Sequence, residues 1–203
     1  MSRIVVLATR NKGKIGELRR ILAEADLDID LRGTDEFPDM PDVAETGSTF
    51  AANATLKSRS AADVTGLPAI ADDSGLCVDA LNGMPGILSA RWAGSHGDDR
   101  ANLDLVLAQT EHLPPERRGA RFVCAAAVSL PGGIDRVVEG ELTGRVIAEP
   151  RGANGFGYDP IFVPSGYEIT TAQMDSVVKD SISHRGRAFR ALAPVLQQLL
   201  AAA

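Results

Sequence analysis

The chain is poor in cysteine and in long apolar stretches. It has two cysteines, Cys77 and Cys124, in 203 residues and no C-x-x-C spacing, which excludes a disulfide framework and a cysteine-based metal site. Both lie in apolar segments, as expected of small buried side chains. The longest stretches without a charged residue, Phe122–Ile134 and Ala191–Ala203, have 13 residues each. A membrane-spanning helix needs about 20, so no membrane segment is expected.

The N-terminus also lacks the pattern of a signal peptide. Its apolar run, Ile4–Ala8, has five residues and charges follow at once, whereas a signal peptide has a longer apolar core. Together with the scarcity of cysteine, this predicts a reducing, cytoplasmic setting.

Basic residues are in deficit too. The chain has 21 Lys and Arg against 27 Asp and Glu, a net charge of −6, which argues against a nucleic-acid partner bound along an extended surface. The charge is uneven, however: residues 1–20 carry +5 and residues 179–190 carry +3. Two cationic clusters in an acidic protein predict a confined site for a small anion.

What remains is an ordinary globular composition. With 203 residues, 44% of them hydrophobic, the chain is expected to form one domain over residues 1–203. Apolar runs predict strands at 4–8, 68–71 and 76–81 and a hairpin over 121–147 with its turn at 131–133. Apolar spacing predicts a helix at 15–25 and a last helix from about residue 186, with a kink at Pro194. A further helix is predicted within 48–64, with Ser48 as its N-cap, and another after an N-cap at Asp98 or Asp99. This mixture predicts an α/β or α+β domain with a mixed sheet.

The first candidate for chemistry is the loop Thr9-Arg10-Asn11-Lys12-Gly13-Lys14. It joins a predicted strand to a predicted helix, where free backbone N–H groups and the helix dipole attract anions. Two lysines and an arginine add charge. The alternative is a solvated basic turn.

The second candidate is Asp72-Asp73-Ser74-Gly75, directly after a predicted apolar strand. Adjacent acids there are costly unless they are exposed, paired or bound to a metal. Oxygen ligands on a rigid strand end suit Mg²⁺, which takes one or two carboxylates together with substrate phosphates and water. The alternative is a turn in which an aspartate binds its own backbone.

Two further candidates lie near the C-terminus. The glycine-rich loop 149–159 carries Phe156 and Tyr158, two of only nine aromatic residues, and offers a flat surface on which a base could stack. Because they share a glycine loop, both are poor candidates for plain core filling; the alternative is that they anchor the loop. The cationic cluster Lys179…His184-Arg185 precedes the last predicted helix and could donate hydrogen bonds to ligand carbonyls. The alternative there is a solvated helix start.

In combination, these segments resemble one enzyme family along nearly the whole chain. The matching motifs, in order, are Thr9-x-Asn11-x-x-Lys14-x-x-Glu17, Glu45-Thr46-Gly47-x-Thr49-Phe50-x-x-Asn53-Ala54, Ala71-Asp72-Asp73-Ser74-Gly75-Leu76, Gly86-Ile87-x-Ser89-Ala90-Arg91, Gly155-Phe156-Gly157-Tyr158-Asp159-Pro160 and Lys179-x-x-x-Ser183-His184-Arg185-Gly186. On these motifs the sequence resembles the inosine triphosphate pyrophosphatase family.

The resemblance implies an α/β fold in which an elongated mixed β-sheet is flanked by helices, with two lobes and an active-site cleft between them. It implies a homodimer and Mg²⁺-dependent hydrolysis of dITP, ITP and XTP to the nucleoside monophosphate and pyrophosphate, which removes deaminated purines from the nucleotide pool. The alternatives are a pyrophosphatase of the same fold with another modified-nucleotide preference and a nucleotide-binding sensor without turnover.

The resemblance also implies roles for single residues. Asp73 is the expected proton acceptor for water, and Asp73 and Glu45 are the expected Mg²⁺ ligands, with Asp72 assisting the metal or the water. The expected substrate-binding residues are Thr9, Arg10, Asn11, Lys12, Gly13, Lys14, Lys57, Ser74, Phe156, Gly157, Tyr158, Asp159, Lys179, His184 and Arg185. Of these, Asn11, Lys14 and Lys57 would hold the triphosphate. Phe156 would stack on the base, whose 6-oxo group would accept from Lys179, His184 and Arg185. A pocket of donors accepts a 6-oxo purine and rejects the 6-amino group of adenine.

Overall fold

The computed structural model describes residues 3–9, 12–23 and 27–202, without the side chains of residues 12–14 and 17. Contacts group the chain into two compact units. Unit 1 comprises residues 1–73, 124–140 and 185–203, and unit 2 comprises residues 74–123 and 141–184. Each is described by itself below.

The structure confirms the α/β class and the mixed sheet. The helices and strands are β1 (Arg3–Leu7), α1 (Lys12–Ala23), β2 (Ile29–Gly33), α2 (Phe50–Thr65), β3 (Ala69–Val78), α3 (Asp99–Thr110), β4 (Gly119–Leu130), β5 (Ile134–Val146), β6 (Phe162–Pro164), α4 (Ser176–Ile182) and α5 (His184–Ala202). In the described part of the chain the strands form a six-stranded sheet in the order β2-β1-β3-β4-β5-β6. Strand β1 runs parallel to β2 and β3, whereas β5 and β6 are antiparallel.

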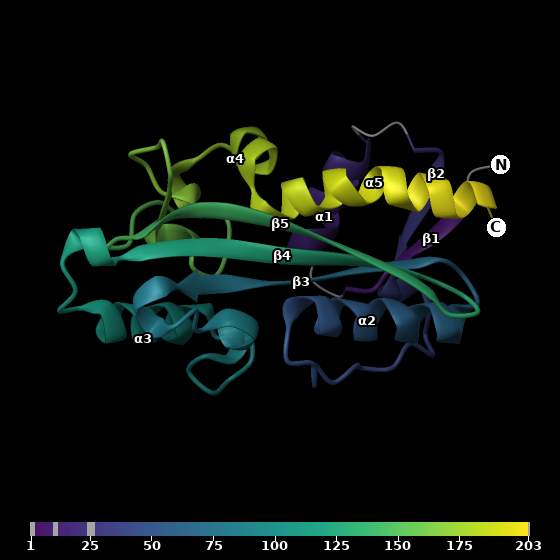
Figure 1. The fold of residues 1–203 in the computed structure, drawn as a ribbon, viewed down its shortest axis with the longest axis horizontal. Coiled ribbons are helices and arrows are strands. Elements are labelled where there is room, and N and C mark those ends of the chain that lie inside the picture. The colour runs from purple at the N-terminus through teal and green to yellow at the C-terminus, as the bar shows by residue number, and fades with distance from the viewer. Residues whose placement is uncertain (1–2, 10–11, 24–26, 203) are drawn as a thin grey trace. The chain divides into compact units, whose positions relative to one another are not determined.

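In unit 1, helices cover both faces of the sheet (Figure 1). Successive residues of a strand point to opposite faces, and the buried residues separate accordingly. Val5 and Ile70 pack with α1 and α5, in a cluster that includes Leu18 and Phe189. Val6 and Ala69 pack instead with the alanines of α2. Both sides of these strands are therefore buried, which explains why the strands read as continuous apolar runs.

Several predicted boundaries were wrong. The predicted strands at 68–71 and 76–81 are one strand, β3, so Asp72-Asp73-Ser74-Gly75 is extended chain and not a turn. The helix predicted after Lys14 already begins at Lys12. Helix α2 is capped by Thr49, whose side chain accepts from the Ala52 N–H at 3.1 Å, and not by Ser48. Helix α4 was not predicted, because its seven residues are too few to show a helical repeat.

Other predictions were confirmed. Strands β4 and β5 form the expected hairpin, and the expected last helix is α5. The N-cap of α3 is Asp98, one of the two predicted candidates, which accepts from the Ala101 N–H at 3.0 Å. Pro194 lies inside α5, and the kink expected there stays a prediction. Both cysteines are buried and free. Unit 2 has its own apolar core, in which Leu103 and Val106 of α3 pack with side chains of the strands such as Phe162. No helix in residues 3–9, 12–23 and 27–202 is long and apolar enough to cross a membrane.

Candidate functional site

Strand β3 directs its two adjacent acids to opposite faces of the sheet. Asp73 follows Ala69 and Ala71 on the side covered by α2, and Asp72 follows Ile70 on the side covered by α5. The contacts agree with this alternation: Asp73 bonds to residues of α2 and Asp72 to a residue of α5. Although the two acids are neighbours in sequence, they belong to different clusters.

The Asp73 carboxylate contacts a lysine and an asparagine one helical turn apart on α2. Lys57 Nζ donates to Asp73 Oδ1 at 3.4 Å and to Glu45 Oε1 at 2.8 Å, and Asn53 Nδ2 donates to Asp73 Oδ2 at 3.1 Å. Residues four apart share one face of a helix, so α2 presents both donors to β3. Glu45 comes from the polar segment that leads into α2. The structure thus brings Glu45, Lys57 and Asp73 together.

The ammonium group of Lys57 remains charged in this cluster. Burial alone would lower the pKa of Lys57, but the carboxylates of Asp73, Asp72 and Glu45 favour the charged form and outweigh it, so the pKa lies above the ordinary lysine value. One permanent cation therefore lies between two carboxylates, an arrangement suited to an ionic ligand.

Asn53 was not among the predicted site residues, yet it is fully buried and links two parts of the site. While its amide nitrogen donates to Asp73, its Oδ1 accepts from the Gly47 N–H at 2.8 Å. A Cβ atom on Gly47 would lie 2.7 Å from this Oδ1, which explains the glycine. The available signal was the spacing of Asn53 and Lys57 on one helix face.

The donor set fits a magnesium ion. Glu45 and Asp73 supply carboxylate oxygens, the hard ligands that Mg²⁺ prefers, and both already contact one cation, Lys57 Nζ. In the described residues there is no cluster of three or more His, Cys, Asp or Glu able to hold a metal. Two carboxylates suffice for Mg²⁺, because it takes its remaining ligands from water and substrate phosphates.

Asp72 forms a buried ion pair on the other face. Arg185, in the first turn of α5, donates from Nε to Asp72 Oδ2 at 3.3 Å, and both residues are at least 97% buried. A buried guanidinium needs such an anion, because an unpaired charge in the interior is very costly. The expected assistance of Asp72 to the metal or the water stays a prediction; in this structure Asp72 holds Arg185.

Two of the expected base-binding residues, Phe156 and Lys179, contact Asp159 in unit 2. This buried carboxylate accepts from Lys179 Nζ and from the Phe156 N–H, the latter at 2.9 Å. Lys179 Nζ also lies 5.5 Å from the centre of the Phe156 ring, within the range of a cation–π contact. Phe156 is 40% exposed. A large aromatic side chain with an open face is what base stacking requires.

Tyr158 is a different case. It is 5% exposed and belongs to the apolar core of unit 2, and its hydroxyl donates to the Ser89 carbonyl at 2.8 Å. The expectation that neither loop aromatic fills the core was therefore wrong for Tyr158. His184 is also buried and stacks on Phe122, with ring centres 4.8 Å apart.

The N-terminal segment is described only in part. Arg10 and Asn11 lie outside the described residues, as do the side chains of Lys12 and Lys14. The backbone of residues 12–14 forms the first turn of α1, and Thr9 lies two residues after the end of β1 at Leu7. The Thr9 carbonyl accepts from the Thr34 hydroxyl at 3.1 Å. The start of α1 five residues after the last residue of β1 agrees with the expected anion site at a helix N-terminus.

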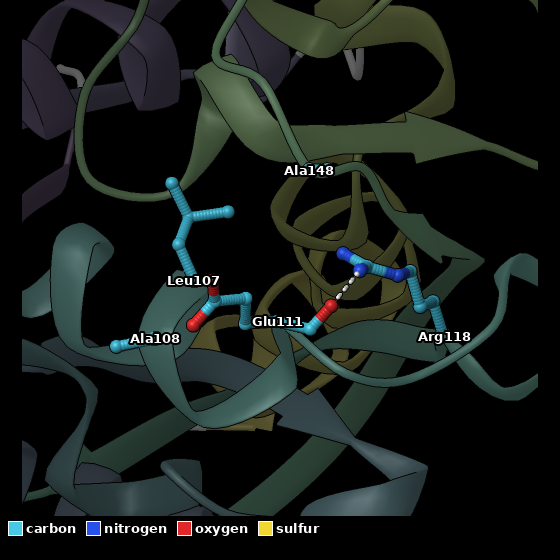
Figure 2. A pocket seen from close by; sticks show the side chains of 5 residues that line it. All are labelled: Leu107, Ala108, Glu111, Arg118 and Ala148. Carbon is cyan, nitrogen blue, oxygen red and sulfur yellow. Dashed lines mark hydrogen bonds between the residues drawn. The ribbon is translucent and has the colours of Figure 1, made fainter.

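Unit 2 also contains a pocket of about 210 Å³ (Figure 2). Leu107, Ala108, Glu111, Arg118 and Ala148 line it, and none of them is a predicted site residue. The Arg118 guanidinium donates to the carbonyls of Glu111 and Leu113 at 3.1 and 3.0 Å. Because carbonyls at the end of a helix lack partners in the helix, Arg118 acts as a cap for the end of α3.

The fold and the Asp73 cluster define an α/β protein whose paired carboxylates and lysine suit a metal ion and a phosphate ligand. A family model described as the Ham1 family matches residues 5–195. The dITP/XTP pyrophosphatase of Streptomyces coelicolor is 61% identical to the chain over 196 residues, which cover 97% of the chain and 98% of the relative.

Solved structures are also similar to the chain in sequence and in fold. The crystal structure of the nucleoside-triphosphatase / dITP/XTP pyrophosphatase from Mycobacterium abscessus is 50% identical and superposes with a TM-score of 0.78 over 94% of this chain and 99% of that one. A HAM1 protein from Coxiella burnetii is 42% identical, with a TM-score of 0.87 over 97% and 99%. The chain belongs to the Ham1 family, and the resemblance predicted from its motifs is confirmed.

Proposed function

We propose that this protein hydrolyses the triphosphates of deaminated purines, dITP, ITP and XTP, to the nucleoside monophosphate and pyrophosphate. The observation that carries the proposal is the cluster of Glu45, Lys57 and Asp73, in which a permanent cation lies between two carboxylates. The relatives that match nearly the full chain are named dITP/XTP pyrophosphatases. The role would be to cleanse the nucleotide pool.

In this proposal the residues of unit 1 act on the triphosphate. Phosphoryl chemistry needs positioning and charge neutralisation more than covalent catalysis. Asn11, Lys14 and Lys57 bind phosphate oxygens, together with the backbone N–H groups at the start of α1. A water oxygen bonds to phosphorus, the P–O bond of the bridge between the α and β phosphates breaks, and pyrophosphate leaves. Asp73 takes the proton of the water.

Mg²⁺ is the proposed cofactor, held by Asp73 and Glu45. When bound, it would neutralise negative charge on the phosphates. Asn53 holds one oxygen of Asp73 and so limits the orientations of this carboxylate. The relevant control is protein without Mg²⁺, for which we expect no turnover.

Among the residues of unit 2, Phe156 is proposed to stack on the base, and Lys179 and His184 are the proposed donors to its 6-oxo group. Arg185, which belongs to unit 1, is the further proposed donor. Adenine carries a 6-amino group, which is itself a hydrogen-bond donor and cannot pair with the donors of the protein. Binding of adenine would therefore leave buried polar groups unpaired. Thr9, Arg10, Lys12, Gly13, Ser74, Gly157, Tyr158 and Asp159 complete the proposed substrate-binding residues. The single catalytic domain over 1–203, the cleft, the homodimer and the cytoplasmic location also stay predictions.

The decisive experiment incubates the purified protein with ITP, XTP, dITP, GTP or ATP, with and without Mg²⁺, and separates the products by anion exchange. We expect IMP and pyrophosphate from ITP in the presence of Mg²⁺ and far slower turnover of ATP. Inorganic phosphate as the first product would contradict the proposal. Asp73→Asn is expected to abolish turnover and to retain ITP binding in calorimetry. Binding without turnover by the unchanged protein would favour the sensor, and preference for another modified nucleotide would favour the second alternative.

A further inference from the structure

The aromatic ring proposed to stack on the base lies on a backbone that has little stiffness of its own. Phe156 stands between Gly155 and Gly157, whose φ angles are +77° and +61°. Glycine adopts this left-handed region readily, but it also allows many other conformations. The position of the exposed Phe156 ring must therefore be set by contacts that the loop makes with other parts of unit 2.

One such contact is local. The Asp159 carboxylate accepts from the Phe156 N–H and also from the Thr171 hydroxyl at 2.8 Å. The bond from the Phe156 N–H to the Asp159 carboxylate joins residues three positions apart and closes the loop on itself. It fixes the shape of the turn, but it does not tie the residue after Phe156 to a rigid element.

A second contact comes from a helix far away in sequence. Asp99 Oδ2 accepts from the Gly157 N–H at 2.8 Å, although 58 residues separate the two. Asp99 lies in the first turn of α3, which packs on the core of unit 2 through Leu103 and Val106. Burial and then the charge of Asp99 raise the pKa of Tyr158, the next residue of the loop. The Asp99 carboxylate thus faces the loop directly after Phe156.

The neighbouring acid, Asp98, has a different role from that of Asp99. Asp98 is the N-cap of α3 and accepts from the Ala101 N–H, so the capping of the helix does not depend on Asp99. A carboxylate is stabilised at a helix N-terminus, and both acids have that benefit. Of the two, Asp99 is the one that binds the loop.

We propose that Asp99 is a positioning residue for base recognition, because its bond to the Gly157 N–H holds the loop in the conformation that presents the Phe156 ring. The inference rests on the proposed function, in which Phe156 stacks on the purine. It assigns a role in binding to a residue that does not touch the reacting phosphates. Loss of the bond lowers the fraction of molecules with the loop in place, and the apparent affinity falls by that fraction.

The test compares three variants by steady-state kinetics with ITP and Mg²⁺. For Asp99→Ala we expect KM to rise roughly three- to tenfold, as for the loss of one hydrogen bond to an exposed carboxylate, and kcat to stay within about twofold. Asp99→Asn keeps an acceptor and should restore most of the affinity. Asp98→Asn removes the same charge one residue away and keeps a good N-cap, so its KM should be unchanged. An equal rise in KM for Asp98→Asn would overturn the proposal.

Two further measurements separate positioning from a general loss of structure. In a Phe156→Ala background, Asp99→Ala should no longer change KM, because the ring that it positions is missing. Inhibition by inorganic triphosphate, which has no base, should be the same for Asp99→Ala and the unchanged protein. An effect of Asp99→Ala that persists without Phe156, or that weakens binding of inorganic triphosphate equally, would show that Asp99 does not act through the ring.

A structural measurement keeps this inference separate from the proposed function. Hydrogen exchange of the amides of residues 155–158 should be faster in Asp99→Ala than in the unchanged protein, and unaltered in Asp98→Asn. Equal exchange rates in Asp99→Ala and the unchanged protein would overturn the inference. If the unchanged protein fails to hydrolyse ITP, the proposed function falls, whereas the exchange experiment still decides whether Asp99 holds the loop.

Discussion

Asn53 offers the sharpest test of the Asp73 cluster, because two substitutions of similar size predict different pH dependence. Asn53→Leu leaves the Gly47 N–H and one oxygen of Asp73 without their buried partner. At about 1–3 kcal/mol for each of the two abandoned groups, we expect the free energy of unfolding to fall by roughly 2–6 kcal/mol. This loss should not depend on pH between 5 and 8.

Asn53→Asp instead places a second carboxylate beside Asp73. The atoms concerned are 3.1 Å apart, and two unit charges at this distance repel by about 5 kcal/mol at an effective dielectric constant of about 20. Lys57, 3.4 Å from the other oxygen of Asp73, offsets part of this repulsion. We expect a net penalty of roughly 2–4 kcal/mol, and the repulsion between the two negative charges raises the pKa of one carboxyl of the pair.

The sign of the pH dependence follows from that rise. In the unfolded chain both carboxyls ionise near pH 4, but in the folded variant one of them keeps its proton to higher pH. The penalty is therefore complete above the raised pKa and is relieved as the pH falls through it. Urea unfolding followed by circular dichroism should show Asn53→Asp closer to the unchanged protein at pH 5 than at pH 8. An equal loss at both values would refute the placement of Asn53 against Asp73.

A control on the same helix separates stability from activity. Ser58 of α2 is fully buried, and its hydroxyl bonds to the Ser129 hydroxyl at 2.8 Å. Ser58→Ala should lower the free energy of unfolding by about 1 kcal/mol and leave kcat for ITP unchanged. Asn53→Leu should lower both.

Three further outcomes are expected. Lys57→Met leaves the two carboxylates that it contacts without their cation, so kcat/KM for ITP should fall at least about tenfold, measured by pyrophosphate release; wild-type kcat/KM would argue against phosphate binding by Lys57. Burial raises the pKa of the Cys77 thiol, so iodoacetamide at pH 8 should label Cys77 in the urea-unfolded chain and spare it in the folded one, as peptide mass mapping would show. Tyr158→Phe removes the bond to the Ser89 carbonyl and should cost about 1 kcal/mol of unfolding free energy; no loss in urea unfolding would show that the bond contributes nothing.

Much of the fold could be predicted from local patterns. The apolar run of β1, the hairpin β4–β5 and the capping of α3 by either Asp98 or Asp99 follow from hydrophobic period and turn chemistry, which act over a few residues. The break predicted at Asp72 was wrong because adjacent acids are typical of turns. Here both side chains find partners on helices, Arg185 and Lys57, and these distant partners allow the strand to continue.

The site shows the same division. The family motifs include Asp73 and Glu45, and Lys57 lies four residues after Asn53 of these motifs; the structure brings Glu45, Lys57 and Asp73 together. The motifs did not indicate that Asn53 supports Asp73, or that Asp99 holds the loop at Gly157, because these contacts join residues 20 and 58 positions apart. Such pairings arise from the packing of helices against strands and leave no periodic signal in a single sequence.

The alternating orientation of the two acids of β3 determines which changes in this strand disturb one cluster and which disturb both. Because neighbouring side chains point to opposite faces, a substitution at Asp72 alters the cluster with α5 and one at Asp73 the cluster with α2. The two clusters still interact through charge, because the Asp72 carboxylate also helps to raise the pKa of Lys57. Loss or gain of a single residue between Ala69 and Asp72 would instead exchange the faces of both acids at once. This short stretch should accept replacements far more readily than changes in length.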